Sequence, residues 1–439
     1  MNKSRLKKAL LFTYYWPPAS GPGVQRWLKF VKFLPEFGWD VIVVTPKKGS
    51  YPNTDPTLLE DIPKHTIIEK TGTIEPFRLF NILSGKPAKG KTSTVGMSEI
   101  KGSQTFVKRI AAYVRANIFI PDARLGWVPF AKSRGKNILK SQPIDLIITT
   151  GPPHSTHLIG LKLSQKYNLP WIADFRDPWT SIYYNKFLPR SERAKKKDAK
   201  LESRVLAAAN STIVVSNGLK KEFQDRAQDI HVIPNGYDSE DFTSLDNQEK
   251  GAYFKLSYIG NLKGNQNCKT VWKAIRELRA VNESFRHSFK LSFTGNIHEE
   301  VLQTFKEYGI DDIIETLPFV EHQEAVKRMY ESDALLFPIP QAENNKQIIT
   351  GKIFEYLASQ TPLLSVGPLH GDAARILEDC NRFPMLDYDD EVGIKQRILT
   401  LFEQWEKPHK QPKHSGTEHE KFSRKKLTQT LAEILNDVA

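Results

Sequence analysis

Short apolar runs alternate along the chain with stretches in which apolar residues recur every three or four positions. Residues 9–14 and 40–44 form the first two runs, and between them the apolar residues from Val24 to Leu34 follow helical spacing. Runs of this length are typical of buried strands, whereas the wider spacing is typical of a helix with one apolar face. These residues are therefore predicted to form a strand, a helix and a second strand, which make a βαβ unit.

The same alternation continues in two series of apolar runs that are rich in β-branched residues. The first series comprises 144–149, 171–175, 212–215 and 231–234. The second series comprises 254–259, 290–293, 334–337 and 362–366. Strands that alternate with helices form parallel sheets covered on both faces. The predicted fold class is therefore α/β, with two Rossmann-like, doubly wound domains.

A polar, acid-rich stretch between Asp238 and Gly251 separates the two series and shows little apolar periodicity. It divides the chain into an N-terminal domain, residues 1–245, and a C-terminal domain, residues 246–415. Residues 416–439 are expected to form a last helix that packs back on the first domain. The chain has 439 residues, of which 39% are hydrophobic, and is therefore long and apolar enough for two cores.

Cysteine content and hydropathy indicate the compartment. The two cysteines, Cys268 and Cys380, have neither the number of a disulfide framework nor the spacing of a metal cluster. No apolar stretch approaches the about 20 residues that cross a bilayer. The basic start and the apolar run to Trp16 are similar to a signal peptide, but the run is short and Pro17 ends it. We interpret this run as the first strand and expect a cytoplasmic protein.

The chain is strongly basic, with a formal net charge of +13 and an isoelectric point near 9.4. This charge favours an anionic partner, which is a nucleic acid, a phospholipid surface or a phosphorylated substrate. No nucleic-acid-binding module is recognisable in the sequence, so nucleic acid is not expected among the partners.

Two basic segments are candidates for contact with an anionic membrane. Residues 100–121 contain no acid, and their basic residues alternate with apolar residues at helical spacing. Those basic residues are Lys101, Lys108, Arg109 and Arg115. Such a helix either lies on a membrane at the inner face or is an ordinary domain helix with a solvated basic side. The run from Arg190 to Lys200 is partly offset by Glu192 and Asp198, which favours a solvated helix.

Residues 85–104 are rich in Lys, Gly, Ser and Thr and contain almost nothing that could be buried. This composition is typical of a surface loop. A lid over an acceptor site would have the same composition, so the sequence does not distinguish the two.

A glycine-rich turn, Gly21-Pro22-Gly23, follows the first predicted strand. The backbone N–H groups of such a turn, at the start of a helix, suit an anion. A dinucleotide-binding oxidoreductase additionally has a third glycine and an acid at the end of the second strand. This chain has Arg26 and Thr45-Pro46 at those places, which disfavours that class.

Charged side chains follow two further predicted strands, at Asp174-Phe175-Arg176-Asp177 and at Gly151-Pro152-Pro153-His154-Ser155. The carboxyl ends of parallel strands are where open α/β sheets bind ligands. Because buried charges are costly unless they are paired, the first cluster is either a structural Asp–Arg pair or catalytic. His154 or Ser155 can cap the next helix, and His154 is either such a cap, a packing residue or a base.

The stretch Thr350-Gly351-Lys352-Ile353-Phe354-Glu355 is the richest in candidate chemistry. Thr350 can cap a helix whose first N–H groups, together with Lys352, would face a diphosphate. Glu355, one turn later, could accept two hydrogen bonds from a ribose diol. The alternative is a Lys–Glu pair on a solvated helix face, and the residues alone do not decide between the two.

Asp387-Tyr388-Asp389 has the Asp-x-Asp spacing that chelates a nucleotide-bound divalent cation in some enzymes. The triplet lies late in the second series, far from the reversal point of the first sheet. We interpret it as a solvated loop and predict no metal site.

Taken together, these segments resemble the family 4 glycosyltransferases of GT-B fold over nearly the full chain. Four motifs in the family's order carry the resemblance: the early Pro-Pro and glycine turn, Ile233-Pro234-Asn235-Gly236-Tyr237-Asp238, Tyr258-Ile259-Gly260-Asn261-Leu262, and the Lys-x-x-Glu helix. The resemblance implies two Rossmann-like domains that face a cleft. It also implies transfer of a sugar from a nucleoside diphosphate to an acceptor hydroxyl, with retained anomeric configuration, without metal or cofactor and with the nucleotide sugar as co-substrate.

The resemblance also implies roles for individual residues. The expected donor-binding residues are Gly23, Gly260, Lys263, Gly295, Val320, Gln347, Thr350, Gly351, Lys352 and Glu355. Gly23, Gly260 and Lys263 would lie near the phosphates, and Gly295 would line the nucleotide. Val320 would flank the base and Glu355 would hold the ribose. The expected catalytic residues are Asp177, His154 and Arg176, of which Asp177 comes first because it shares a strand end with Arg176.

Two positions depart from the family pattern. Gln347 stands where the family often has Glu, and Asn261 stands where an Arg commonly follows the loop glycine. Glutamine carries no charge, and asparagine cannot neutralise a diphosphate as a guanidinium does. The leading hypothesis is a glycosyltransferase that extends a glycan or lipid-linked acceptor in cell-surface polysaccharide synthesis. The alternative is a non-catalytic nucleotide-sugar-binding or scaffold protein of a glycan assembly complex.

Overall fold

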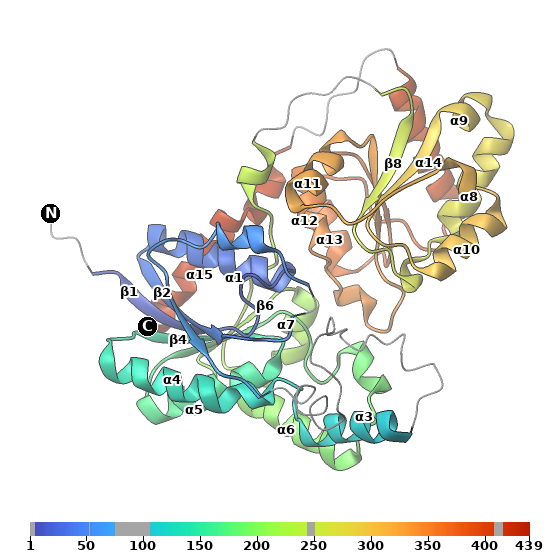
Figure 1. The fold of residues 1–439 in the computed structure, drawn as a ribbon. Helices are drawn as coiled ribbons and strands as arrows, with labels where there is room; N and C mark the ends of the chain where they lie inside the picture. Colours follow the sequence, from blue (N-terminus) through green and yellow to red (C-terminus); the bar gives the residue numbers. More distant parts are fainter. Residues whose placement is uncertain (1–4, 52, 75–105, 244–250, 408–415) are drawn as a thin grey trace. The chain divides into compact units, whose positions relative to one another are not determined.

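The computed structural model describes residues 5–51, 53–74, 106–243, 251–407 and 416–439 (Figure 1). The predicted loop or lid at 85–104, Lys101 and the predicted boundary after residue 245 lie outside these residues. The chain divides into two compact units: unit 1 is Met1–Asn235 with Arg424–Ala439, and unit 2 is Gly236–Ser423. The division comes before the predicted boundary because Tyr237 is buried in a core of unit 2.

Unit 1 contains a seven-stranded parallel sheet in the order β3-β2-β1-β4-β5-β6-β7. Its strands are β1 Lys7–Phe12, β2 Trp39–Pro46, β3 Ile67–Thr71, β4 Leu146–Gly151, β5 Trp171–Phe175, β6 Ser211–Val214 and β7 Ile230–Val232. Its helices are α1 Pro22–Phe33, α3 Phe106–Ile118, α4 Val128–Ser141, α5 His157–Tyr167, α6 Glu192–Ala208, α7 Asn217–Phe223 and α15 Arg424–Val438.

Helices cover both faces of this sheet because successive side chains of a strand point to opposite sides. Ala9 and Leu11 of β1 pack with α1 and α15 on one face. Leu10 and Phe12 pack with α4, α5 and α6 on the other. The last helix of the chain, α15, lies against α1 and places Leu431 in the same core.

Unit 2 contains a five-stranded parallel sheet in the order β10-β9-β8-β11-β12. Its strands are β8 Phe254–Ile259, β9 Phe289–Thr294, β10 Ile314–Leu317, β11 Ala334–Pro338 and β12 Leu363–Val366. Its helices are α8 Lys269–Val281, α9 Glu283–Ser288, α10 Glu299–Tyr308, α11 His322–Glu331, α12 Lys352–Ala358, α13 Asp372–Asp379 and α14 Glu391–Glu406. Two separate apolar cores, one on each face, hold these helices to the sheet.

The predicted α/β class with two Rossmann-like domains is confirmed, and each predicted apolar run overlaps a strand. Two edge strands were not predicted, β3 and β10. Their residues are mostly half-buried or exposed, so they lack the apolar run that marks the inner strands. In the described part of the chain, no helix combines the length and apolar character needed to span a membrane.

Candidate functional sites in the two units

Three predicted site segments follow the carboxyl ends of strands in the sheet of unit 1. Because β1 lies between β2 and β4, the chain leaves the sheet centre in one direction through β2 and β3 and in the other through β4 to β7. Ligands of open α/β sheets bind beyond the carboxyl ends of the strands at such a reversal. The segments that follow β1, β4 and β5 all begin at these carboxyl ends.

Arg176 lies directly against the start of α1. A Cβ atom at Gly23 would lie 1.1 Å from Arg176 Nη1, so the guanidinium occupies the space that any other residue at position 23 would fill. Arg176 Nε donates to the carbonyl of Gly151 at 3.2 Å, and Nη2 donates to the carbonyl of Pro152. Three predicted site segments, around Gly23, Gly151 and Arg176, are thereby brought together.

Asp174 has a structural partner that the sequence did not indicate. Its buried carboxylate accepts hydrogen bonds from Arg26 Nη2 at 3.0 Å, Trp27 Nε1 at 2.6 Å and Thr150 Oγ1 at 2.7 Å. These bonds tie α1 to β4 and β5. The structural Asp–Arg pair is therefore Arg26–Asp174, and Arg176 is held by backbone carbonyls instead.

His154 and His157 form a buried aromatic stack with the end of β5. The His154 ring lies 5.0 Å from Trp179, and the His157 ring lies 4.3 Å from Phe175. Burial, with smaller contributions from neighbouring charges, lowers the pKa of His154 well below its usual value and that of His157 to about 3. Both rings are therefore neutral at physiological pH.

Two nitrogens of these rings face a common point beside Gly151. A Cβ atom there would lie 2.6 Å from His157 Nε2 and 3.0 Å from His154 Nδ1. Neither nitrogen has a hydrogen-bond partner among the described residues. His157 was not among the predicted site residues, although its spacing of three from His154 on a helical segment was the signal that could have identified it.

The predicted helix cap at His154 or Ser155 is wrong. Neither side chain caps α5, whose N-terminal flanking residue is Thr156 without a side-chain bond. The Ser155 backbone N–H and hydroxyl both donate to the Asp122 carboxylate, each at 2.8 Å. Asp177, the next residue after Arg176, is half-buried, and burial raises the pKa of its carboxyl while Arg176 opposes the shift.

In unit 2, two glycines lie at the ends of β8 and β9. Gly260 and Gly295 have φ values of 119° and 114°, which side-chain-bearing residues rarely adopt. A Cβ atom at Gly295 would lie 2.7 Å from the carbonyl oxygen of Gly260. The backbone N–H of Gly260 donates to Thr294 O at 2.7 Å, and that of Gly295 donates to Leu317 O at 2.9 Å.

Lys352 approaches these glycines from α12. A Cβ atom at Gly260 would lie 2.5 Å from Lys352 Cε and 2.8 Å from Nζ. Lys352 Nζ donates to the Tyr258 hydroxyl at 3.1 Å and lies 4.9 Å from the centroid of that ring. Burial lowers the pKa of Lys352, and Glu355 opposes the shift. Tyr258 is thus a contact of the site that the motif contained but to which no role was assigned.

The predicted Thr350 cap of α12 is also wrong. The residue before the helix is Gly351, which already has helical dihedrals and forms no side-chain cap. Thr350 Oγ1 is instead buried without a partner among the described residues, and the same holds for Gln347 Oε1. Buried polar atoms are rarely left unsatisfied, so water or a ligand is expected to supply hydrogen bonds to these two oxygens.

The remaining predicted donor residues lie in other surroundings. Glu355 is half-buried on α12, one turn after Lys352. Lys263 is exposed in the loop that follows Gly260, and Val320 is half-buried beyond the end of β10. No group of three or more metal-ligating side chains occurs among the described residues. In the Asp387–Asp389 triplet, Asp387 Oδ1 accepts a hydrogen bond from the backbone N–H of Asp389 at 3.2 Å.

Comparison with known proteins gives one sequence match and several structural ones. Residues 92–241 match the model of Glycosyltransferase Family 4. No curated protein matches the chain. The sucrose-phosphate synthase of Thermosynechococcus elongatus is similar in structure, with 13% identity, a TM-score of 0.56 and coverage of 98% of this chain and 94% of that one.

Two further solved structures are similar over their whole length. WaaG, a glycosyltransferase involved in lipopolysaccharide biosynthesis, shows 13% identity and a TM-score of 0.53, with coverage of 97% of this chain and 99% of WaaG. The N-terminal domain of the Candida albicans trehalose-6-phosphate phosphatase shows 13% identity and a TM-score of 0.62, with coverage of 100% of this chain and 99% of that domain. At these identities the structural likeness establishes the fold.

Proposed function

Because the chain is a family 4 glycosyltransferase of GT-B fold, we propose that it moves a sugar from a nucleoside diphosphate sugar to a glycan or lipid-linked acceptor, with retention of anomeric configuration. The reaction uses no metal and no cofactor, and the nucleotide sugar is the co-substrate. The protein works at the inner membrane face in the synthesis of a cell-surface polysaccharide.

The contact between Lys352 and Gly260 carries the donor assignment. Because the N–H groups of Gly260 and Gly295 are already used within the unit, the Lys352 ammonium is the positive group best placed for a diphosphate. A half-buried cation such as Lys352 beside a leaving diphosphate stabilises the negative charge that develops when the sugar departs. The unsatisfied oxygens of Gln347 and Thr350 accept hydrogen bonds from donor hydroxyls, and Glu355 holds the ribose.

Asp177, His154 and Arg176 are the proposed catalytic residues of unit 1. The raised pKa of Asp177 suits a carboxyl that meets a reacting hydroxyl, because desolvation makes it a stronger proton acceptor. The neutral His154 offers an unprotonated nitrogen. Arg176 lies against the start of α1, and its charge interacts with the neighbouring Asp177.

A donor screen tests this function. Purified full-length protein is incubated with a panel of nucleotide sugars and with acceptors from a membrane extract, and nucleoside diphosphate release and sugar incorporation are measured. We expect release and incorporation with one donor, and loss of both in the Asp177→Asn variant. An inactive protein that still binds one donor would refute transfer.

That last outcome would favour the alternative, a non-catalytic nucleotide-sugar-binding or scaffold protein of a glycan assembly complex. One observation supports it. Asn261 Oδ1 accepts a hydrogen bond from the backbone N–H of Asn296 at 3.2 Å, so the residue in place of the family's arginine has a structural role. Donor binding would then persist without a second cation to stabilise a leaving diphosphate.

A further inference from the structure

Four helices of unit 1 are strongly basic. Helices α3, α4, α5 and α6 contain fifteen Lys and Arg residues but only three Asp and Glu residues, in a chain whose net charge is +13. Helices α4, α5 and α6 pack on the same face of the sheet through one core. Helix α4 contacts α5, and α6 contacts both α5 and α3, so the four form one layer.

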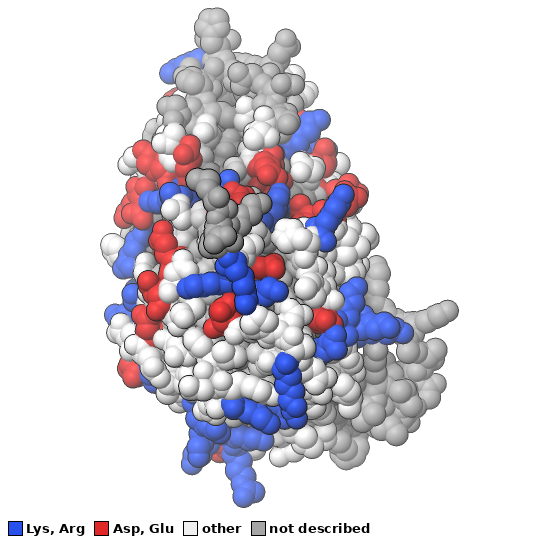
Figure 2. Space-filling model, turned by 90° about the vertical axis from the view of Figure 1, so that its left-hand side faces the viewer, with Lys and Arg blue, Asp and Glu red and all other residues white. Residues whose placement is uncertain are grey.

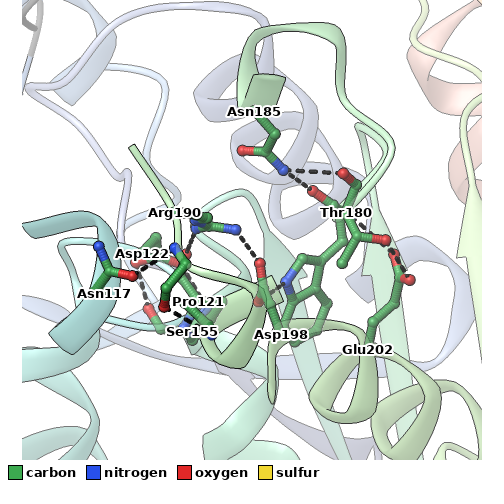
Figure 3. Close-up of polar contacts among 12 residues, drawn as sticks. Asn117, Pro121, Asp122, Ser155, Thr180, Asn185, Arg190, Asp198 and Glu202 are labelled. Atoms are coloured by element: carbon green, nitrogen blue, oxygen red, sulfur yellow. Dashed lines mark hydrogen bonds and ion pairs between the residues drawn. The ribbon is translucent and has the colours of Figure 1, made fainter. Parts of the chain in front are cut away.

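Two of the three acids of this layer, Asp198 and Glu202, point inward, as Figure 3 shows. Asp198 and Glu202 of α6 are each 1% exposed. Asp198 accepts a hydrogen bond from Trp179 Nε1 at 2.8 Å and pairs with Arg190. Glu202 accepts from the Thr180 hydroxyl at 2.8 Å and pairs with Arg226 at 2.8 Å. Their charges are used to fix the loop after β5.

Within the basic run at 190–200 the acids offset two of the cations, as expected, because Asp198 pairs with Arg190 and Glu192 pairs with Lys195. Only Glu192 of the three acids is exposed, where it pairs with Lys195 at 2.8 Å. The other exposed cations of α4, α5 and α6 are Lys132, Arg134, Lys136, Lys140, Lys162, Lys166, Arg193, Lys196, Lys197, Lys200 and Arg204. Among the described residues, Arg134 is the one member of this set that forms an ion pair, with Glu69. Figure 2 shows Lys and Arg gathered at the lower end of this face.

Helix α3 adds exposed apolar side chains at one end of this basic layer. Tyr113, Val114 and Ile118 are 54%, 38% and 61% exposed. Asn117 ties this stretch to the start of α6, because its Oδ1 accepts from the Ser191 backbone N–H at 2.8 Å. Exposed aromatic and aliphatic side chains beside unpaired cations are typical of surfaces that lie in a membrane interface.

We propose that the layer of α4, α5 and α6, with the exposed end of α3, docks on an anionic lipid bilayer. The charges spread across neighbouring helices, which matches the extended anionic surface of a bilayer. Lysine predominates over arginine in the set. Lysine acts as a hydrated point charge, whereas arginine forms the planar, bidentate contacts that nucleic acid recognition favours. The inference rests on the proposed function only in that a lipid-linked acceptor places the enzyme at a membrane.

Vesicle sedimentation with the full-length protein tests this surface. The vesicles contain either phosphatidylcholine alone or phosphatidylcholine with 30% phosphatidylglycerol, at physiological salt. We expect binding to the anionic vesicles and its loss at high salt. The triple variant Lys196→Glu, Lys197→Glu, Lys200→Glu is expected to weaken binding about 100-fold, because each lysine near an anionic surface contributes roughly a factor of five. The α4 variant Lys132→Glu, Lys136→Glu, Lys140→Glu is a second, independent test.

A matched control separates the surface from the overall charge. Lys255→Glu, Lys306→Glu, Lys327→Glu changes the net charge equally, but its exposed lysines lie in unit 2. This control should bind as the wild type does. Equal binding to neutral and anionic vesicles, an α6 variant that binds normally, or displacement of the vesicles by duplex DNA would each overturn the proposal.

Sugar transfer to a soluble acceptor distinguishes this inference from the proposed function. Neither triple variant alters a residue of the proposed catalytic or donor sites, so transfer to a soluble acceptor should stay unchanged. A wild-type protein that transfers sugar but ignores anionic vesicles refutes the docking surface alone. A protein that binds vesicles but transfers no sugar refutes the proposed function alone.

Discussion

Each unit places a cation where the Cβ of a non-glycine residue would lie, but the two cations differ in how they are held. Arg176 of unit 1 lies against Gly23 and donates to the carbonyls of Gly151 and Pro152, with Asp174 and Asp177 nearby. Lys352 of unit 2 lies against Gly260, and its ammonium donates to the Tyr258 hydroxyl. The arginine is anchored by the fold, whereas the lysine retains the capacity to bind an anion.

The surroundings of the two cations differ in the same sense. Around Arg176 the neighbouring rings are stacked and buried, and the histidines remain neutral. Around Lys352 two buried oxygens lack partners among the described residues, and two glycines have positive φ values. Rigid, satisfied groups are suited to positioning, and under-satisfied groups are suited to binding. The stability of unit 1 is therefore expected to be sensitive to changes in burial, and anion binding by unit 2 to changes in charge.

The largest expected effect is acid destabilisation of unit 1 through His157. The unfolded-state pKa is near 6.5 and the folded-state pKa is about 3, so folding favours the neutral ring. The resulting stability is present above pH 6.5 and is lost as the pH falls toward 3, with a total of about 5 kcal/mol. Urea unfolding at several pH values, followed by tryptophan fluorescence, measures this slope.

The control for this prediction is a second histidine of unit 1. His157→Phe keeps a ring against Phe175 and should reduce the loss of stability at acid pH. The loss that remains should be the part caused by His154. His231→Gln alters a partly exposed histidine and should leave the loss at acid pH unchanged. A loss at acid pH that is identical in His157→Phe and in wild type would show that the stack is open to water.

The next effect in size is on donor binding. Lys352→Met keeps the length of the side chain but removes its charge, and we expect the affinity for the nucleoside diphosphate to fall about 100-fold because a charge-assisted hydrogen bond is lost. Titration calorimetry measures this change. Because the pKa of Lys352 is lowered, wild-type affinity should also decline as the pH rises toward that pKa, whereas the variant should not respond.

Lys263→Met is the matched control for this charge. Lys263 is exposed, and it is the second lysine that the sequence associates with the diphosphate. Its loss should change affinity less than threefold, because an exposed charge is screened by solvent. If the effects of the two variants were reversed, Lys263 would be the anion ligand, and the contrast between the two units would not hold.

The sequence predicted the architecture more completely than the contacts. Apolar runs identified the inner strands because burial on both faces leaves a local signal. The same signal is weak at β3 and β10, which lie at sheet edges. The motif order placed Gly260 and Lys352 in one site, but their separation by 92 positions gave no local indication of contact.

Side-chain partners far apart in the sequence were the main omissions. Arg26 was noted as the absence of a glycine, and the structure shows that it is the buried partner of Asp174. Asp198 was counted as a surface charge, although Trp179 and Arg190 hold it inside. The caps assigned to Thr350 and Ser155 failed because other bonds and dihedrals at the helix starts prevailed. Such choices depend on tertiary contacts that periodicity does not encode.

A pair of glycine variants compares the two units in stability. Gly260→Ala places a side chain at a φ of 119° and against Lys352, so we expect a loss of about 2 kcal/mol. Gly23→Ala lies within α1, where alanine is favoured, but it displaces Arg176 from its carbonyl partners. The gain from alanine in the helix and the cost of displacing Arg176 offset each other, so the net loss of stability should not exceed about 1 kcal/mol. Chemical denaturation measures both.

Removing each cation then separates backbone strain at the glycine from displacement of the neighbouring cationic side chain. Gly23→Ala combined with Arg176→Ala relieves the overlap, and alanine in α1 should then be tolerated relative to Arg176→Ala alone. Gly260→Ala combined with Lys352→Ala keeps the unfavourable φ and should remain destabilised relative to Lys352→Ala alone. If removing the cation changed the cost of the alanine equally in both pairs, the positive φ of Gly260 would not distinguish it from Gly23.

The smallest expected effect is a gain of function at position 261. Asn261→Arg adds a guanidinium to the exposed loop after Gly260, the glycine that Lys352 approaches. It also removes the bond from the Asn296 backbone N–H to Asn261 Oδ1, which contributes about 1 kcal/mol of loop order. The added charge and the lost order oppose each other, so diphosphate affinity should rise by no more than about fivefold in calorimetric titration. An increase that disappears in Asn261→Lys would show that planar, bidentate contact is needed, and a decrease in both variants would show that the Asn261–Asn296 bond contributes more to the site than a second cation does.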